Sequence, residues 1–335
     1  MILVTGGTGL VGSHLLYQLT KENKSVKAIY RNEKKLAIVK KVFSYYTDNP
    51  NILFNKIEWI QADLLDIPQL TQAFKGISFV YHCAAFVSFE PNKYWLLRKT
   101  NIEGTANIVN LSIDNKIKKM CYVSSVATLG STNNKDRIDE ETLWNPEADN
   151  AVYGITKYGA EMEVWRGTQE GLDAVIVNPG VIIGPGIWKY GSGNIFKKVA
   201  NGLQYYTDGT VGYIDVFDVV NIMIQLLESN IKNKRFVLVS ENWTYKYFID
   251  CIANALKVKP PSKKAGVIIL GIGWRLDWLY CKLTGKRRSL SKQLSNTLMS
   301  KSIYDNSKIK RHLNIEFKPI NVSIKEVSEI YLKEN

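Results

Sequence analysis

A tyrosine and a lysine that could transfer protons together lie four residues apart in the helical pattern of residues 151–169, AVYGITKYGAEMEVWRGTQ. This spacing places the side chains of Tyr153 and Lys157 on one face of a helix. A phenol with a pKa of ~10 is a poor acid or base at neutral pH. Because an adjacent ammonium stabilises the phenolate, we expect Lys157 to lower the pKa of Tyr153 and to make it useful in general acid–base chemistry.

Ser125 supplies a third group, 28 residues before Tyr153. The segment KMCYVSSVATLG (119–130) predicts a strand that runs into a polar loop, and open α/β folds bind ligands at the carboxyl ends of parallel strands. The Ser125 hydroxyl could hold a carbonyl oxygen during hydride delivery while Tyr153 supplies or removes the proton. Neither Ser125 nor Ser124 lies in a G-x-S-x-G sequence, which disfavours a hydrolase with a nucleophile elbow.

The first thirty residues predict a strand, a tight turn and a helix that together could bind a dinucleotide. The apolar run ILVT is followed by GGTGLVG and then by SHLLYQLTKEN, whose apolar residues recur at helical spacing. We expect Gly6 to permit the turn, Gly9 to let the backbone approach the pyrophosphate and Gly12 to let the helix pack on the strand. The phosphates would lie at the helix N-terminus beside Thr8 and Leu10, where N–H groups and the helix dipole favour anions.

The position after the second predicted strand, SVKAIY (25–30), indicates which nicotinamide dinucleotide binds. An acid here would accept a hydrogen bond from the ribose 2′-hydroxyl, whereas an arginine would pair with a 2′-phosphate. The chain has Arg31 at this position, with Lys34 and Lys35 nearby and no acid before Glu33. We therefore expect NADP rather than NAD. The alternative is that Arg31 is a solvated loop cation and that the 2′-phosphate is not recognised.

The third and fourth predicted strands add candidates for cofactor contact. IEWIQADLLD contains Asp63 and Leu64 at its carboxyl edge, where an acid can accept from the adenine amino group and an aliphatic side chain can cover the ring. In the alternative, Asp63 or Asp66 only caps the next helix. SFVYHCAA ends in small residues, Ala84 among them, that let the backbone approach a ligand. We expect His82 to be a packed or hydrogen-bonded structural residue.

Seven segments spread over the first 186 residues form a recognisable series. In chain order they are TGGTGLVG (5–12), ADLLD (62–66), HCAA (82–85), NIEGT (101–105), YVSSVATLG (122–130), YGITK (153–157) and NPGVIIGPG (178–186). This series resembles the extended short-chain dehydrogenases/reductases, the NAD-dependent epimerase/dehydratase family. Arg31 and the sequence HCAAFVSF are most similar to the branch of dihydroflavonol 4-reductases, cinnamoyl-CoA reductases and 3β-hydroxysteroid dehydrogenases.

The resemblance implies a role for each matching position. Tyr153 would be the general acid/base, Lys157 would bind the nicotinamide ribose and tune the tyrosine, and Ser125 would orient the substrate. Pro179 would shape the nicotinamide pocket, and Asn101 would help to position the loop over the cofactor. The implied activity is dihydroflavonol-4-reductase-like, the NADP-dependent reduction of a ketone or an aldehyde.

Two other functions stay open beside the reductase. A dehydratase is not one of them. Sugar-nucleotide dehydratases of this superfamily carry an acidic pair after the serine position, whereas Ser125 is followed by Val126 and Ala127, which disfavours this activity. A nucleotide-sugar epimerase needs little beyond hydride return to the opposite face of its substrate, and is the nearest enzymatic alternative. The second alternative is a regulatory protein that senses NADP without turnover, although such proteins usually lack the tyrosine or the lysine retained here.

We predict an α/β fold, a doubly wound parallel sheet (Rossmann fold) with a smaller, discontinuous C-terminal substrate domain. Residues 1–186 would form the NAD(P)-binding domain, with residues 206–242 returning to it. Residues 187–205 and 243–335 would form the substrate-binding domain. With 335 residues, of which 45% are hydrophobic, the chain can bury cores of this size.

The net charge of +13 is concentrated in the second half of the chain. Residues 1–180 contain 20 Lys and Arg against 19 Asp and Glu, whereas residues 181–335 contain 24 against 12. A basic field there would attract an anionic substrate, a nucleic acid or an acidic membrane surface, or it is only a lysine-rich soluble surface. Because no nucleic-acid-binding motif accompanies the charge, we expect no nucleic acid. The resemblance implies a small carbonyl or alcohol substrate, which could be anionic or hydrophobic.

Other features predict a cytoplasmic protein without a metal. No apolar run reaches the ~18 residues needed to span a bilayer, and the first motif begins too close to Met1 for a signal peptide. The cysteines, Cys83, Cys121, Cys251 and Cys281, lack metal-ligand spacing, and we expect buried free thiols. The resemblance also allows a homodimer, formed through the helix of the tyrosine motif.

The stretch AGVIILGIGWRLDWLYCKL (265–283) is apolar and aromatic, but Arg275 and Asp277 make it too polar to span a membrane. We expect a helix packed on the core. The alternative is an amphipathic lip for a hydrophobic substrate or a peripheral membrane contact, assisted by the basic residues of 282–288.

Overall fold

A seven-stranded parallel sheet lies at the centre of the computed structural model, which describes residues 1–130, 137–286, 288 and 290–335. The strands are arranged in the order β10-β6-β5-β4-β1-β2-β3. The order reverses between β1 and β4, which confirms the doubly wound α/β fold predicted from the sequence. The strands span Ile2–Thr5 (β1), Val26–Tyr30 (β2), Ile57–Gln61 (β3), Phe79–His82 (β4), Lys119–Val123 (β5), Ala174–Pro179 (β6) and Lys234–Leu238 (β10).

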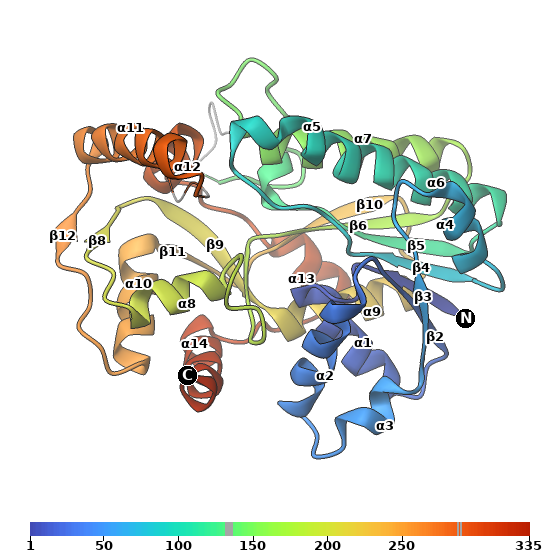
Figure 1. The fold of residues 1–335 in the computed structure, drawn as a ribbon. Helices are drawn as coiled ribbons and strands as arrows, with labels where there is room; N and C mark the ends of the chain where they lie inside the picture. The colour runs from blue at the N-terminus through green and yellow to red at the C-terminus, as the bar shows by residue number, and fades with distance from the viewer. Residues whose placement is uncertain (131–136, 287, 289) are drawn as a thin grey trace.

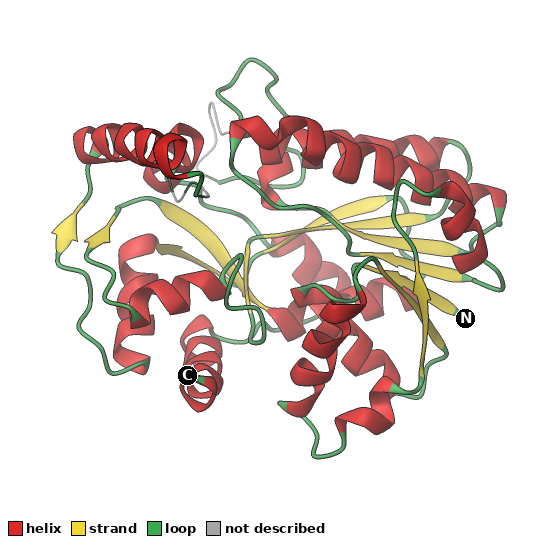
Figure 2. Cartoon of the chain, in the orientation of Figure 1, coloured by secondary structure: helices red, strands yellow, loops and turns green. Residues whose placement is uncertain are grey.

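Helices cover both faces of this sheet (Figures 1 and 2). One layer consists of Leu10–Lys21 (α1), Leu36–Ser44 (α2), Pro50–Phe54 (α3) and Val216–Glu228 (α9). The other consists of Ile67–Ala73 (α4), Tyr94–Leu97 (α5), Gly104–Asp114 (α6) and Val152–Gln169 (α7). Each helix between two parallel strands returns the chain to the same end of the sheet, so the carboxyl ends of the strands share one edge.

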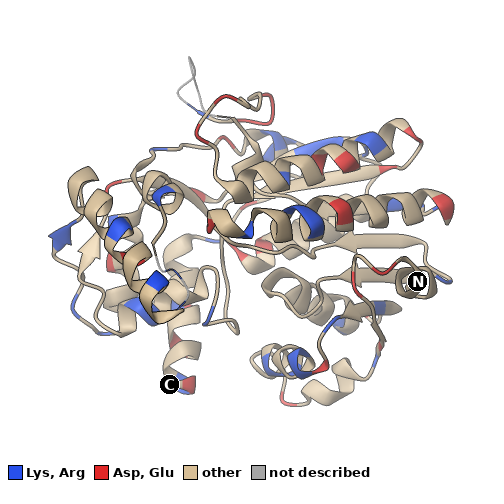
Figure 3. Cartoon of the chain, turned by 45° about the horizontal axis from the view of Figure 1, so that its top comes forward, with Lys and Arg blue, Asp and Glu red and all other residues tan. Residues whose placement is uncertain are grey.

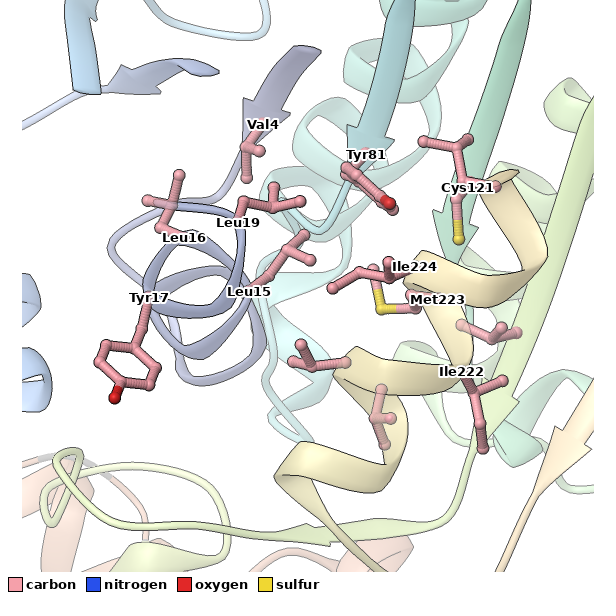
Figure 4. Packing of buried hydrophobic residues seen from close by; sticks show 14 of the residues in the cluster. Val4, Leu15, Leu16, Tyr17, Leu19, Tyr81, Cys121, Ile222, Met223 and Ile224 are labelled. Carbon is pink, nitrogen blue, oxygen red and sulfur yellow. The ribbon is translucent and has the colours of Figure 1, made fainter. Parts of the chain in front are cut away.

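The alternation of side chains along the strands gives the sheet two separate cores. On β1, Leu3 and Val4 are both fully buried but belong to opposite clusters, Leu3 with residues of α6 and α7 and Val4 with residues of α1 and α9. Figure 4 shows the second of these clusters, in which side chains of α1 and α9 lie against Tyr81 of β4 and Cys121 of β5. Burial on both faces fixes the register of the strands and thereby the positions of their ends.

The rest of the chain forms two smaller sheets and further helices beside the large sheet (Figure 1). The three-stranded sheet has the order β11-β9-β7, and the two-stranded sheet pairs β12 with β8. The strands are Val181–Ile183 (β7), Tyr205–Tyr206 (β8), Thr210–Asp215 (β9), Glu241–Thr244 (β11) and Lys263–Lys264 (β12). The helices are Gly193–Ala200 (α8), Tyr245–Ala255 (α10), Val267–Thr284 (α11), Lys292–Met299 (α12) and Ile320–Glu334 (α14). Ser307–Leu313 (α13) instead packs on β10 of the large sheet. The assignment of residue ranges to two domains stays a prediction.

The helix α11 does not pack on the core, so the expectation for residues 265–283 is wrong. Among its side chains, Leu270 and Cys281 are buried, whereas Ile268 (79% exposed) and Leu283 (77%) protrude into solvent. The helix packs against α12 along one face. An apolar sequence therefore predicted the helix correctly but not its surroundings, because an apolar pattern does not show whether another part of the chain covers the helix.

Candidate active site

The carboxyl ends of β1, β4 and β5 bring the predicted site residues to one edge of the sheet. Gly6 follows β1, Ala84 lies two residues after β4 and Ser125 two residues after β5. The helix α7 packs against η4 (Val126–Thr128), the short helix that begins after Ser125. The sheet order reverses at β1 and β4, and ligands bind at this point in doubly wound folds.

Tyr153 on α7 and Ser125 at the end of β5 face each other through their hydroxyl groups. Burial raises the pKa of Tyr153 to about 12, and the nearby Ser125 hydroxyl acts in the opposite direction and lowers it. The Ser125 Oγ accepts a hydrogen bond from the Ala127 N–H at 3.1 Å, which leaves its own proton for the phenol oxygen. Tyr153 as a residue is half-buried, and its ring centroid lies 5.6 Å from that of Phe89. The two hydroxyls are therefore positioned to share one ligand oxygen.

The neighbouring Ser124 has a different environment. It is buried, and its hydroxyl donates to the Glu161 carboxylate at 2.6 Å. The structure thus brings Ser125, and not Ser124, to Tyr153, which is the choice made from the sequence.

Lys157 lies one turn after Tyr153, but its amine points toward β5. The Nζ atom donates to the Tyr122 hydroxyl at 2.6 Å and to the Val123 carbonyl at 2.8 Å. Burial lowers the pKa of Lys157 to about 7, although the negative charge of Glu161 raises it. This amine can therefore gain or lose its proton near neutral pH.

The expectation that Lys157 lowers the pKa of Tyr153 below its ordinary value is not met in this structure. Removal of the phenol from water outweighs the hydrogen bond from Ser125, so the pKa rises. The lysine amine is held by the hydroxyl and carbonyl groups of β5. The four-residue spacing fixes the helix face on which both residues lie, but the long lysine side chain still has a choice of acceptors.

The glycine loop after β1 has the shape needed by a phosphate group. Gly6 has a φ of +69°, and a Cβ at this position would lie 2.6 Å from the Ala84 nitrogen. A Cβ at Gly12 would clash with the Gly6 carbonyl oxygen. Gly9 precedes α1, and no side chain of the described residues caps this helix end by a hydrogen bond. The N–H groups of the first turn can therefore bind an anion, and the loop fits the pyrophosphate of a dinucleotide.

Arg31 and Asp63 meet at the ends of β2 and β3. The Arg31 Nη1 lies 3.6 Å from the Asp63 Oδ2, and the arginine side chain is 65% exposed and can reach a ligand. Asp63 also accepts from the Leu65 N–H at 3.0 Å. The cap of α4 is Asp66, which accepts from the Gln69 N–H at 3.0 Å. Of the two acids considered from the sequence, Asp66 thus caps the helix and Asp63 stays at the sheet edge.

Asn101 ties the loop after β4 to the tyrosine helix. Its buried side chain accepts from the Phe86 N–H at 2.7 Å and donates to the Phe86 carbonyl at 3.0 Å and to Thr156 Oγ1 at 3.2 Å. It lies in η3 (Arg98–Glu103), a π-helical turn of the kind that often occurs at functional sites. The loop held in this way includes Phe89, the aromatic neighbour of Tyr153.

The remaining cofactor candidates lie around the same edge. Leu64 follows β3 and is buried beside Gly104. Pro179 is the buried last residue of β6. Thr8 and Leu10 are partly exposed in the glycine loop.

His82 is a structural residue, as the sequence predicted. Its Nδ1 lies 2.6 Å from Thr5 Oγ1, its Nε2 lies 2.9 Å from Thr105 Oγ1, and its ring stacks on Tyr122. Burial lowers its pKa to about 3, so the ring is neutral at physiological pH. The four cysteines are free thiols, as predicted. Burial was predicted for all four, but it holds for Cys121 and Cys281, whereas Cys83 and Cys251 are partly exposed. In the part of the chain that the structure describes, no group of three or more His, Cys, Asp or Glu residues could hold a metal ion.

Sequence analysis missed a buried carboxylate beneath the strand ends. Glu161 is fully buried, and it accepts hydrogen bonds from Ser124 (2.6 Å), Thr128 (2.8 Å), Asn178 (2.8 Å) and Arg235 (3.0 Å). These partners belong to the ends of β5 and β6, to η4 and to β10. One carboxylate therefore joins α7 to three strands next to the site. The available signal was its spacing, since Tyr153, Lys157 and Glu161 recur at four-residue intervals on one helix face.

These features define a dinucleotide-binding α/β protein with a serine, a tyrosine and a lysine gathered at the carboxyl edge of its sheet. Residues 2–239 match the profile of the NAD dependent epimerase/dehydratase family, and the chain belongs to this family. It is an NAD(P)-dependent enzyme of the extended short-chain dehydrogenase/reductase type, which confirms the resemblance found in its motifs.

Named relatives include reductases. The chain is 32% identical to the Synechocystis sp. protein named "Putative dihydroflavonol 4-reductase", over 64% of this chain and 60% of that protein, so the match spans less than two thirds of this relative. It is 26% identical to tetraketide alpha-pyrone reductase 2 of Arabidopsis thaliana, over 78% of this chain and 84% of that protein. The fold is shared with the UDP-glucose 4-epimerase of Thermus thermophilus in complex with NAD (TM-score 0.75, 17% identity, 99% and 98% of the two chains covered).

The Glu161→Gln variant tests the carboxylate network. We expect its free energy of unfolding to fall by about 3 kcal/mol, because the largely buried Arg235 guanidinium loses its negative partner. The measurement is equilibrium unfolding in urea. The control is Glu163→Gln on the same helix, whose partner Arg166 lies at the surface, with an expected change below about 1 kcal/mol. Equal losses in the two variants would contradict a special role for Glu161.

Proposed function

We propose that this protein reduces a ketone or an aldehyde with NADPH, in a dihydroflavonol-4-reductase-like reaction with Tyr153 as the general acid. The observation that carries the proposal is the placement of Ser125 and Tyr153 together at the edge of the sheet that also bears the glycine loop. The reductases named among the relatives support a carbonyl as the reacting group.

Bound NADPH would supply a hydride to the carbonyl carbon. Ser125 can donate a hydrogen bond to the carbonyl oxygen, and Tyr153 can give its proton to the same oxygen as it becomes a hydroxyl. With a pKa of about 12, Tyr153 holds this proton throughout the neutral range. Transfer from so weak an acid requires that the phenolate be stabilised. Lys157, one turn away, would do so in its protonated form if its amine turned from the groups of β5 toward the phenol.

The cofactor would lie across the reversal of the strand order. Gly6, Gly9 and Gly12 would bind the pyrophosphate together with Thr8 and Leu10 at the start of α1. Arg31 suits the 2′-phosphate of NADP because its guanidinium is exposed just after β2.

Other residues fit the two ends of the cofactor. Asp63 and Leu64 would contact the adenine. Ala84, Asn101 and Pro179 would border the nicotinamide half, where Asn101 acts through the backbone of the loop that it holds.

Removal of one hydroxyl tests the general acid. In Tyr153→Phe we expect turnover to fall by about 10²–10⁴-fold, since the proton donor is lost, while the Kd for NADPH stays within about twofold. Turnover is followed by NADPH oxidation against a panel of ketones and aldehydes, and binding by fluorescence titration. Tyr158→Phe, on the same helix and stacked on Trp144, is the control and should keep full activity. An equal loss of NADPH binding and turnover in Tyr153→Phe would point to a structural role instead.

The pKa of Lys157 predicts the alkaline limb of the pH profile. Its ammonium form predominates below a pKa of about 7 and is lost above it. If this charge stabilises the phenolate, kcat/KM for reduction should decline as the pH rises through about 7, with a slope approaching tenfold per unit. Lys157→Met should show a lower rate and no such limb. A wild-type profile that is flat between pH 6 and 9 would refute the role of the ammonium.

Arg31→Ala tests the choice of cofactor. We expect the Kd for NADPH to rise at least tenfold and the Kd for NADH to change little, because only NADPH carries the 2′-phosphate. The control is Lys56→Ala, which removes a surface cation bonded to Asn23, on another part of the surface. Equal weakening of both cofactors in Arg31→Ala would remove the assignment of NADP.

A nucleotide-sugar epimerase is the second candidate, favoured by the excess of 24 Lys and Arg over 12 Asp and Glu in residues 181–335. Such a field suits the diphosphate of a sugar nucleotide. The test is incubation with UDP-sugars and analysis of the products. Epimerisation leaves the absorbance of the cofactor unchanged overall, whereas reduction of a carbonyl consumes NADPH.

A further inference from the structure

The exposed side of α11 carries a continuous apolar stripe. Its members are Ile268, Ile272, Leu276, Leu279 and Leu283, all exposed. At 100° per residue these five side chains fall within an arc of about 80° on the helix surface. The opposite side of the helix is the packed one and contains the buried Leu270 and Cys281. The stripe therefore faces away from the protein along the whole length of the helix.

Basic residues border this stripe. Arg275 and Lys282 lie beside it on the helix, 4.4 Å and 5.2 Å from the ring centroids of Trp274 and Trp278. Between residues 263 and 288 the described part of the chain holds one acidic side chain, Asp277, which pairs with Arg288. The basic residues in the same range are Lys263, Lys264, Arg275, Lys282, Lys286 and Arg288. In Figure 3, Lys and Arg mark β12 and positions along α11.

The helix is connected to the candidate active site through α12. Arg288 donates to the Trp274 carbonyl at 3.2 Å and so links the middle of α11 to the chain that enters α12. At the start of α12, Ser291 donates to the Phe89 carbonyl at 2.9 Å. Phe89 is the ring that packs on Tyr153. The apolar stripe thus lies on the outer side of the pair α11 and α12, and α12 contacts the loop that places Phe89 beside Tyr153.

The charges beside the stripe indicate which kind of partner could cover it. In a symmetric pair of copies the same patch meets itself, which would place the cations of one copy against those of the other. No helix within the described ranges is long and apolar enough to cross a membrane. An apolar stripe flanked by Arg and Lys, with Trp and Tyr at its borders, matches the surface of a lipid layer with anionic headgroups.

We propose that α11 is a membrane-docking helix that lies in the plane of an anionic lipid surface. The stripe from Ile268 to Leu283 inserts among the acyl chains, and Arg275, Lys282 and Lys286 contact the headgroup phosphates. The inference goes beyond the proposed reaction and does not depend on it, because docking requires no turnover.

Vesicle binding tests the proposal with the full chain. Sedimentation with sucrose-loaded vesicles should give a partition coefficient at least tenfold higher for vesicles of phosphatidylcholine with 30% phosphatidylglycerol, about the charge of an anionic membrane, than for phosphatidylcholine alone. Leu276→Asp should lower it at least tenfold, as should the double variant Arg275→Glu/Lys282→Glu. The matched control is Ile52→Asp on α3, since Ile52 and Leu276 are both 61% exposed.

Two further measurements keep the outcome decisive. NADPH binding and the circular dichroism spectrum should be the same in all variants. A lower partition coefficient then cannot be attributed to misfolding of the variant. Sedimentation velocity reports self-association. Equal partition of Leu276→Asp and Ile52→Asp would overturn the proposal. So would a dimer that Leu276→Asp converts to a monomer without any vesicle binding by the wild type, because the stripe would then cover a second copy of the chain.

Discussion

The carboxylate of Glu161 is the interaction on which the geometry of the site depends. It is fully buried, and a buried charge is stable only when its hydrogen bonds and its charge are satisfied. Ser124, Thr128 and Asn178 donate hydrogen bonds to it from the ends of β5 and β6 and from η4. Arg235 of β10 donates a further hydrogen bond and adds the opposite charge. The donors include Ser124, whose neighbour is Ser125. The position of the Ser125 hydroxyl relative to Tyr153 therefore depends on the hydrogen bonds that the buried Glu161 carboxylate needs, and not only on the conformation of the loop after β5.

The same carboxylate acts on the proton chemistry. Glu161 lies one turn beyond Lys157, and its negative charge raises the pKa of the lysine against the larger effect of burial. The balance places this pKa at about 7. Tyr153, one turn earlier, keeps a raised pKa and so stays protonated at neutral pH. Three residues at four-residue intervals on α7 therefore anchor the helix, tune the amine and present the phenol.

Most of the fold and the membership of the site could be predicted because they depend on local patterns. Alternating strands and helices predict a parallel sheet, and the spacing of Gly6, Gly9 and Gly12 predicts a phosphate-binding turn. The helical period predicts that Tyr153 and Lys157 share a face. Ser125 follows a strand whose end must lie at the ligand edge. Each of these statements needs only the chain near the residue in question.

The features that could not be predicted depend on partners distant in the sequence. The amine of Lys157 bonds to groups on β5, more than thirty residues earlier, and this choice follows from the packing of α7 on the sheet. The network of Glu161 includes Arg235, 74 residues later. The exposure of α11 is of the same kind, since composition indicates an apolar helix but only the assembled chain shows whether another surface covers it. The stripe on α11 stays uncovered in the folded chain and is bordered by cations. An anionic lipid surface would bury its apolar side chains among the acyl chains and would pair its cations with the headgroups.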